Sequence, residues 1–275
     1  MRAVVVALMW AGCTCHPGPF APIAAGSVGL PHRGVLTDAA MLEPTGPGFV
    51  RLRSDALGYG TPSLVHTIRE ACGQVGDAQS PCVVADMSAR FGGALLPKHA
   101  SHRTGRDVDI LYFVTDIAGR PIRSPGFVRF EKHGLAKDAA GTWVRFDAAR
   151  NWALVRALTM AEDARVEWIF VHPVIRDWLL KYAFEHHESK DTMSRAQLVL
   201  GLAGGPKAPH DDHMHVRVAC TQAEVLTGCV ASATVRDWVH TAPSPLSLMQ
   251  EDPLLAEELL APAAALSAVA QAHDE

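Results

Sequence analysis

Two short stretches of this chain concentrate histidines and aspartates. The first, HASHRTGRDVDI, contains His102 and Asp109 with six residues between them. The second, HDDHMH, ends in His213 and His215, which are separated by one methionine. Imidazole and carboxylate groups are common ligands of a catalytic metal and common carriers of a proton in an active site. The two stretches therefore predict a metal site or a proton-transfer site.

Strand geometry decides what the second stretch can do. Residues two apart in a β-strand point to the same side and lie about 6–7 Å apart along it. The side chains of His213 and His215 can thus reach the same place. Both can bind one ion, or one can bind it while the other transfers a proton beside it. The alternate positions carry apolar side chains for the opposite side, namely Met214, Val216 and Val218.

Taken together, the two stretches match the ligand set of a hydrolytic zinc site. Zinc in hydrolases takes three protein ligands from His, Asp and Glu and leaves the fourth position to water. His102, Asp109 and one histidine of the second stretch would supply such a set. The metal lowers the pKa of its water towards neutrality and polarises the carbonyl under attack. A neighbouring imidazole can accept and return the proton, so the combination predicts a Zn²⁺-dependent hydrolase.

Hydrophobic patterns and turn residues predict the elements that hold these stretches. Asp109 is expected at the mouth of a strand, and Gly105 is expected to let the preceding loop turn. Ser63 is the expected N-cap of the first helix, after Pro62. We expect helices over 63–75, 148–164 and 173–185, and strands over 82–87, 107–114, 166–171 and 213–220.

Length and composition indicate a folded, globular protein. The chain has 275 residues, of which 48% are hydrophobic and 20% charged, enough for one large or two modest domains. Lysine and arginine number 25 and aspartate and glutamate 29, which gives a formal net charge of -4. No basic domain or stripe marks a nucleic-acid binder, so we expect no nucleic-acid partner.

The first thirteen residues, MRAVVVALMWAGC, have the pattern of an export signal: a basic residue, a short apolar run and small residues before Cys13. The apolar run is too short to span a bilayer as a helix. Its end resembles a bacterial lipobox, in which the cysteine is acylated, although Trp10 stands where leucine is preferred. We therefore expect the chain in the periplasm or cell envelope, either secreted or anchored in the outer membrane as a lipoprotein through Cys13.

Six cysteines in an exported chain invite disulfides. Cys72 and Cys82 flank one polar loop and Cys220 and Cys229 another, so two local disulfides are the simplest pairing. The alternative is that some of these cysteines stay reduced as small buried hydrophobes.

The two stretches and their flanks resemble the penicillin-insensitive murein endopeptidases, zinc enzymes of the wider lysostaphin and D-Ala-D-Ala metallopeptidase group. The motifs that carry the resemblance are HASHRTGRDVDI and HDDHMHVRVAC, supported by GSVG, FVRLRSDALGYGTPSLVHTIREA, FGG and EWIFVHPVIRDWLL. Together they cover residues 26 to 229. The resemblance implies an α+β fold, with a small antiparallel central sheet, flanking helices and the zinc site at the sheet face.

The resemblance also implies roles that spacing leaves open. Asp107 matches a family position, with no role beyond support of a ligand. His99 and His210 would stabilise the oxyanion or orient the peptide. The chain departs from the family pattern at Ala94–Lys98, which separates two glycines from His99. The implied zinc ligands are His102, Asp109 and His215, and the implied catalytic residues are His213, His99 and His210.

The expected domain organisation has four parts. Residues 1–12 are the signal peptide, and 13–48 are a tether with a β-hairpin leading into the domain. Residues 49–232 form the zinc peptidase domain, and 233–275 an Ala/Leu-rich C-terminal tail.

The expected substrate is peptidoglycan, cut at the cross-bridge bond between D-alanine and meso-diaminopimelate. One alternative is a D,D-carboxypeptidase or dipeptidase on the same fold, which would close its pocket on a free carboxylate through Arg90, Arg103 or Arg217. A second is a non-catalytic envelope protein that keeps zinc for stability or binds peptidoglycan without cutting it. The retained His213 argues against the second, because a structural site normally fills its fourth position with a protein ligand.

Overall fold

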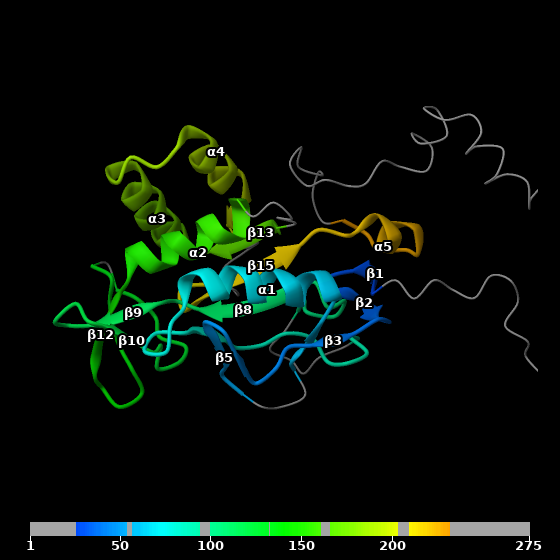
Figure 1. Cartoon of the computed structure of the whole chain (residues 1–275), viewed down its shortest axis with the longest axis horizontal. Helices are drawn as coiled ribbons and strands as arrows, with labels where there is room; N and C mark the ends of the chain where they lie inside the picture. Colours follow the sequence, from blue (N-terminus) through cyan, green and yellow to red (C-terminus); the bar gives the residue numbers. More distant parts are fainter. Residues whose placement is uncertain are drawn as a thin grey trace, which may run out of the picture.

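A seven-stranded sheet lies at the centre of the part of the chain that the structure describes (Figure 1). This computed structural model describes residues 26–53, 57–93, 100–131, 133–160, 166–202 and 209–231. The middle of the sheet is antiparallel, as predicted, and parallel pairings with β14 and β5 extend it at both sides. In spatial order the strands are β14 (Leu200–Leu202), β13 (Val166–Val171), β15 (His213–Val218), β8 (Asp107–Leu111), β7 (Cys82–Val84), β5 (Phe49–Arg51) and β4 (Thr45–Gly46).

Helices pack on one face of this sheet. In Figure 1, α1 crosses in front of β8 and β15, and α2, α3 and α4 gather beside it. Buried side chains of α1, α2 and α4 share one apolar core with the strands. The fold is therefore α+β, as expected. The helices are α1 (Pro62–Val75), α2 (Ala148–Met160), α3 (Pro173–Glu185), α4 (Lys190–Val199) and the short α5 (Gln222–Leu226).

Smaller sheets surround the central one. One has the strand order β10 (Pro121–Ile122), β9 (Val114–Asp116), β12 (Trp143–Phe146), β11 (Leu135–Lys137). The others are the hairpin of β1 (Ser27–Leu30) with β2 (Arg33–Leu36) and the pair of β3 (Ala40–Met41) with β6 (Tyr59–Gly60).

The segment before Phe49 holds four strands, β1 to β4, and its hairpin of β1 and β2 matches the one expected there. Residues 1–25, with the expected signal and Cys13, lie outside the described residues, as does the expected tail 233–275. Among the described residues, no helix is both long enough and apolar enough to cross a membrane.

Side-chain alternation separates the helix-facing core from the sheet face that carries Asp109 and His215. Val108 and Ile110 of β8 face the helices together with Met214 and Val216 of β15. Burying a side chain of this size stabilises the fold by about 1.5–3 kcal/mol. The residues between them, including Asp109, point away from the helices. The alternation predicted for Met214, Val216 and Val218 is confirmed, and the opposite sheet face carries Asp109 and His215 beside a small apolar cluster that includes Leu111.

The predicted helix boundaries agree best with the structure where a proline begins the helix. Helix α3 has the predicted bounds, 173–185, with proline at its first position. The predicted N-cap of the first helix is wrong: Thr61, not Ser63, accepts the hydrogen bond from the backbone N of Leu64, at 3.2 Å. The reason is that Pro62 occupies the first turn, where its fixed φ suits the helix, so the cap lies one residue before it.

The strand predicted over 107–114 is interrupted after Leu111. The side chain of Asn151, on α2, forms hydrogen bonds with both backbone polar groups of Phe113. Its Oδ1 accepts from the Phe113 N at 3.0 Å, and its Nδ2 donates to the Phe113 O at 2.8 Å. These bonds replace the ladder bonds that would have continued the strand. The strands predicted over 82–87 and 213–220 also end earlier, at Val84 and Val218.

Of the two predicted disulfides, one is present. Cys220 and Cys229 are bonded. The predicted bond between Cys72 and Cys82 is wrong for this structure, in which both are buried free thiols. They lie in the apolar core between α1 and β7, where a reduced cysteine packs as a small hydrophobe. Burial, together with the neighbouring Cys72, raises the pKa of the Cys82 thiol well above its ordinary value.

A buried arginine ties β13, β15 and the two ends of the described region together. The guanidinium of Arg106 is fully buried and lies 3.3 Å from the Glu167 carboxylate. It also donates to the carbonyls of Val218, at 3.1 Å, and Val230, at 2.9 Å, and to the hydroxyl of Ser27, at 3.2 Å. One side chain therefore joins four distant points of the chain.

Removing this cation is expected to destabilise the domain strongly. Arg106→Met should lower the free energy of unfolding by about 3–5 kcal/mol, because the buried Glu167 carboxylate would lose this cation and the carbonyls of Val218 and Val230 would lose their donor. Urea denaturation followed by circular dichroism measures the loss. Arg120→Met is the matched control, since it breaks the exposed ion pair with Asp116, which should be worth less than about 1 kcal/mol. Equal effects of the two changes would contradict this role for Arg106.

Candidate metal centre

The register of β8 and β15 builds the centre of the site. His215 lies directly opposite Asp109, and Arg217 lies opposite Asp107. The Nδ1 atom of His215 is 3.0 Å from Oδ1 of Asp109. Directly opposed residues of two antiparallel strands have neighbouring side chains, so the pairing joins the two sequence stretches at one point of the sheet face.

His102 reaches the same carboxylate from the loop before β8. Its Nε2 atom is 3.3 Å from Oδ1 of Asp109, and its ring meets the His215 ring edge-on with 4.7 Å between centroids. The loop turns through left-handed backbone at His102 (φ 64°) and Gly105 (φ 74°). A Cβ atom at Gly105 would lie 2.7 Å from a methyl group of Leu36, so the expected need for glycine there is confirmed.

The three predicted ligands form a compact, buried group. One ligand atom from each of His102, Asp109 and His215 lies within 4.8 Å of the others. The residues are 1%, 3% and 6% exposed. Two imidazoles and one carboxylate in this arrangement could hold a metal ion from one side and leave its other side to water and substrate.

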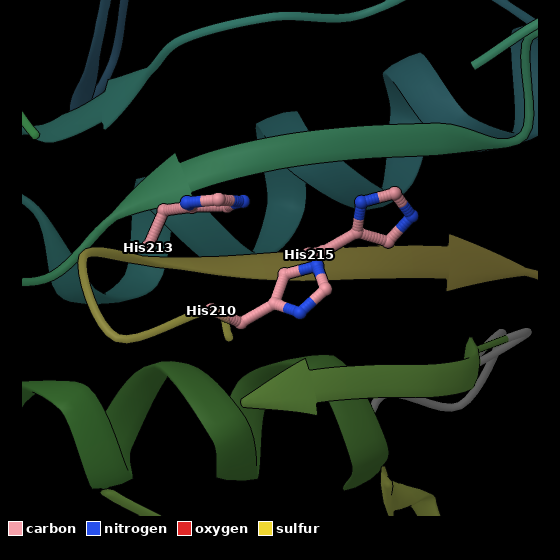
Figure 2. Close-up of side chains that lie close together, drawn as sticks. All are labelled: His210, His213 and His215. Carbon is pink, nitrogen blue, oxygen red and sulfur yellow. The ribbon is translucent and has the colours of Figure 1, made fainter. Parts of the chain in front are cut away.

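Two further histidines border this group (Figure 2). His213 and His215 project from the same side of β15, and His210 points towards them from the loop before the strand. The His210 ring centroid is 5.0 Å from that of His213 and 5.4 Å from that of His215. These three histidines form a second group whose ligand atoms lie within 4.8 Å of one another.

The position of His210 is fixed through its backbone. It has left-handed backbone geometry, with φ 50°. Its carbonyl oxygen accepts hydrogen bonds from the hydroxyl of Tyr112 at 2.9 Å and from the N of His172 at 3.1 Å. Burial raises the pKa of Tyr112 well above its ordinary value, so this hydroxyl keeps its proton and remains a donor at neutral pH.

Asp107 sits behind His215 and fixes its ring. Its Oδ1 is 2.9 Å from Nε2 of His215 and accepts from Nε of Arg217 at 2.6 Å, and its Oδ2 accepts from the N of His102 at 3.2 Å. A carboxylate can only accept, so Nε2 of His215 carries the hydrogen and Nδ1 faces Asp109. Burial alone would raise the pKa of Asp107, but Arg217 and His215 outweigh it and hold that pKa far below its ordinary value.

Charge at the centre is concentrated on Asp109. Burial opposes its ionised form, yet the surrounding imidazoles hold its pKa well below the ordinary value, with His102 the largest influence. For His213 burial favours the neutral ring, but hydrogen bonds to Asp109 and Asp212 and their charges raise its pKa to about 10. The same competition, with Asp107 and Asp109 as the carboxylates, raises the pKa of His215. The carboxylates thus favour positive charge at this centre, and a bound metal ion would supply that charge in place of the rings and leave them neutral.

A family model described as penicillin-insensitive murein endopeptidase matches residues 27–238, which is well over half of the chain. The chain belongs to this family.

Relatives with that same name match over most of this chain. One from Klebsiella pneumoniae is 29% identical over 203 residues, covering 70% of this chain and 66% of the relative. One from Escherichia coli is 27% identical over 203 residues, covering 72% and 68%. One from Salmonella arizonae is 29% identical over 227 residues, covering 79% and 73%. The chain therefore spans about two thirds of the length of the relatives it matches.

In this member of the family, five of the six site residues expected from sequence come together on one sheet face. The sixth, His99, lies outside the described residues, as does the segment Ala94–Lys98. Of the arginines named for the carboxypeptidase alternative, Arg217 is 9% exposed and donates through Nε to Asp107 within the sheet.

Two residues that contact His213 received no role from the sequence. Nδ1 of His213 is 2.6 Å from Oδ1 of Asp212, and the ring of Phe127 meets the His213 ring edge-on at 5.5 Å between centroids. Phe127 is 38% exposed, and the guanidinium of Arg53 lies 6.0 Å from its centroid. The acidic pair directly before His213 was the only available signal for Asp212, and no local pattern pointed to Phe127.

Proposed function

We propose that this chain is a zinc-dependent murein endopeptidase that hydrolyses peptide cross-bridges of peptidoglycan, at the amide bond between D-alanine and meso-diaminopimelate. The observation that carries the proposal is the buried convergence of His102, Asp109 and His215 beside His213, in a chain that belongs to this family. No serine acts as nucleophile in this proposal, so β-lactams should not inhibit the enzyme.

The donor set fits zinc. Oδ1 of Asp109 has nitrogen atoms of His102, His213 and His215 at 3.3, 3.4 and 3.0 Å. Two imidazoles and a carboxylate are the ligands that catalytic zinc takes when it keeps a fourth position open. His102, Asp109 and His215 would hold the ion. Zinc bound there would supply Lewis acidity, which lowers the pKa of a bound water and polarises a substrate carbonyl.

The chain's own residues would position and move the proton. His213 presents Nε2 towards the centre and remains 18% exposed at its side chain, so substrate can reach it. It would accept the proton of the attacking water and return it to the leaving amine. His210 would donate to the oxyanion or orient the peptide. Asp107 would hold the hydrogen on Nε2 of His215 and so leave its Nδ1 lone pair for the ion.

The proposal includes the setting of the enzyme. An export signal at residues 1–12 would deliver the chain to the periplasm or cell envelope, where peptidoglycan is its partner. Acylation of Cys13 would anchor it to the outer membrane, with 13–48 as the tether and its lead into the peptidase domain. The peptidase domain would end near residue 232 and precede the tail 233–275.

The decisive experiment uses the purified protein with its zinc content measured. Cross-linked dimeric muropeptides are incubated with it, with and without a chelator, and the products are identified by mass spectrometry. We expect conversion of dimers to monomers that stops with the chelator and returns with added zinc. Loss of only a terminal alanine would instead select a carboxypeptidase, and intact dimers with zinc bound would select a non-catalytic protein.

Zinc affinity should depend on Asp107, whose carboxylate contacts the proposed ligand His215. Asp107→Asn is expected to weaken zinc binding by about 10–100-fold, because a neutral amide replaces the charged acceptor that fixes the His215 tautomer. Competition with a chromophoric chelator measures the affinity. Asp116→Asn removes a carboxylate from a surface turn at β9 and serves as the control, which should bind zinc as tightly as the wild type. Unchanged affinity in Asp107→Asn would refute the role of Asp107.

A further inference from the structure

Both nitrogen atoms of the His213 ring have a defined neighbour. Nδ1 is 2.6 Å from Oδ1 of Asp212, and Nε2 is 3.4 Å from Oδ1 of Asp109 at the centre of the site. A neutral imidazole carries one hydrogen, and a carboxylate at hydrogen-bond distance can only accept it. The closer carboxylate, Asp212, therefore favours the ring form with hydrogen on Nδ1 and a lone pair on Nε2.

The backbone places Asp212 for this contact. Adjacent residues within a strand point to opposite faces, so Asp212 could not meet the ring of its neighbour from inside β15. Strand β15 begins at His213, and the two aspartates before it lie in a bend. The bend returns the Asp212 carboxylate to the face on which the His213 ring stands.

Surrounding groups hold the pair in place. The rings of Phe127 and His210 pack against the His213 ring, with centroids at 5.5 and 5.0 Å. The Asp212 and His213 side chains are 19% and 18% exposed, so the bond between them is partly shielded from water. Nε of Arg129 lies 3.9 Å from Oδ2 of Asp212, which leaves Oδ1 directed at the histidine.

We propose that Asp212 is a positioning residue for the reaction: it fixes the orientation and tautomer of the His213 ring so that the Nε2 lone pair faces the reacting centre. The inference rests on the proposed function for the step it assists. Asp212 itself touches neither substrate nor metal in this scheme. It acts through His213, as a carboxylate behind a catalytic imidazole does in other hydrolases.

Asp211 is a matched control within the same bend. It carries the same charge and lies 3.6 Å from the same arginine, Arg129, while Asp212 makes the hydrogen bond to His213. If only the negative charge of these aspartates mattered, changes at Asp211 and at Asp212 would lower kcat equally. If the position of the His213 ring matters, only the changes at Asp212 will lower kcat.

The test compares Asp212→Asn and Asp212→Ala with Asp211→Asn and Asp211→Ala in the zinc-loaded protein. We expect the Asp212 changes to lower kcat for dimeric muropeptides by about 10–100-fold, with KM within about twofold. The Asp211 changes should leave both values within about twofold. Equal losses at the two positions, or an unchanged kcat in Asp212→Ala, would overturn the inference.

A second readout does not depend on activity. Nitrogen-15 correlation spectra, assigned with His213→Ala, report which ring nitrogen of His213 carries the hydrogen. We expect Nδ1–H in the wild type and a mixture of both forms in Asp212→Ala. If the wild type cleaves dimers but Asp212→Ala leaves the His213 tautomer unchanged, this inference alone is overturned. If the wild type does not cleave dimers but Asp212→Ala changes the tautomer, the proposed function is overturned and the positioning role of Asp212 remains.

Discussion

His213→Ala is expected to lower kcat/KM for dimeric muropeptides by about 10²–10⁴-fold, the usual contribution of a general acid–base group. The reason is geometric: its Nε2 faces the centre from the open side, 3.4 Å from Oδ1 of Asp109. The proposed ligands His102, Asp109 and His215 are untouched by the change, so zinc content should stay at the wild-type level.

The control for this variant is His66→Ala, on the exposed side of α1. It removes an imidazole from the helix layer, on the other side of the sheet from the site, and should keep the wild-type rate. A His213→Ala protein that kept the wild-type rate would show that the proton is carried by another group. Loss of zinc together with loss of rate would show that His213 is a ligand.

Asp109→Ala is expected to remove zinc almost completely, with a loss of affinity well above the roughly 10–100-fold effect of changes behind the ligands. Asp109 is the one carboxylate of the proposed set, and its oxygen lies within 3.4 Å of three imidazoles. Without it the ligands would be neutral or mutually repelling rings. Metal analysis after dialysis and a chelator titration measure the loss.

This experiment also separates two overlapping ligand groups. His215 belongs both to the group with His102 and Asp109 and to the group with His210 and His213. Its Nε2 is bound by Asp107, so Nδ1 alone is left for an ion and only one group can use it. We therefore expect His210→Ala to retain zinc. Retention in Asp109→Ala and loss in His210→Ala would assign the metal to the other group.

Local rules predicted much of this arrangement. The side-chain period of two placed His213 and His215 on the same side of a strand, and proline at the start of α3 set the predicted bounds of that helix. Apolar alternation in β15 also indicated which side of that strand faces the core. The resemblance implied which histidine binds metal, a choice that spacing alone left open.

Features that depend on distant residues could not be predicted. The pairing of His215 with Asp109 joins positions more than a hundred residues apart, and no local pattern encodes that register. The break after Leu111 depends on Asn151, a side chain on a helix that forms later in the chain. Whether two cysteines bond depends likewise on where the fold places them, and for Cys72 and Cys82 the core leaves them as thiols.

The left-handed backbone of His102 and His210 has a consequence for how this fold can evolve. Such a conformation costs a non-glycine residue about 1–3 kcal/mol, and glycine would adopt it without that cost. Glycine at either position would relieve that strain and would also remove an imidazole from the centre. In the proposed enzyme, stability and activity would therefore oppose each other at these two positions.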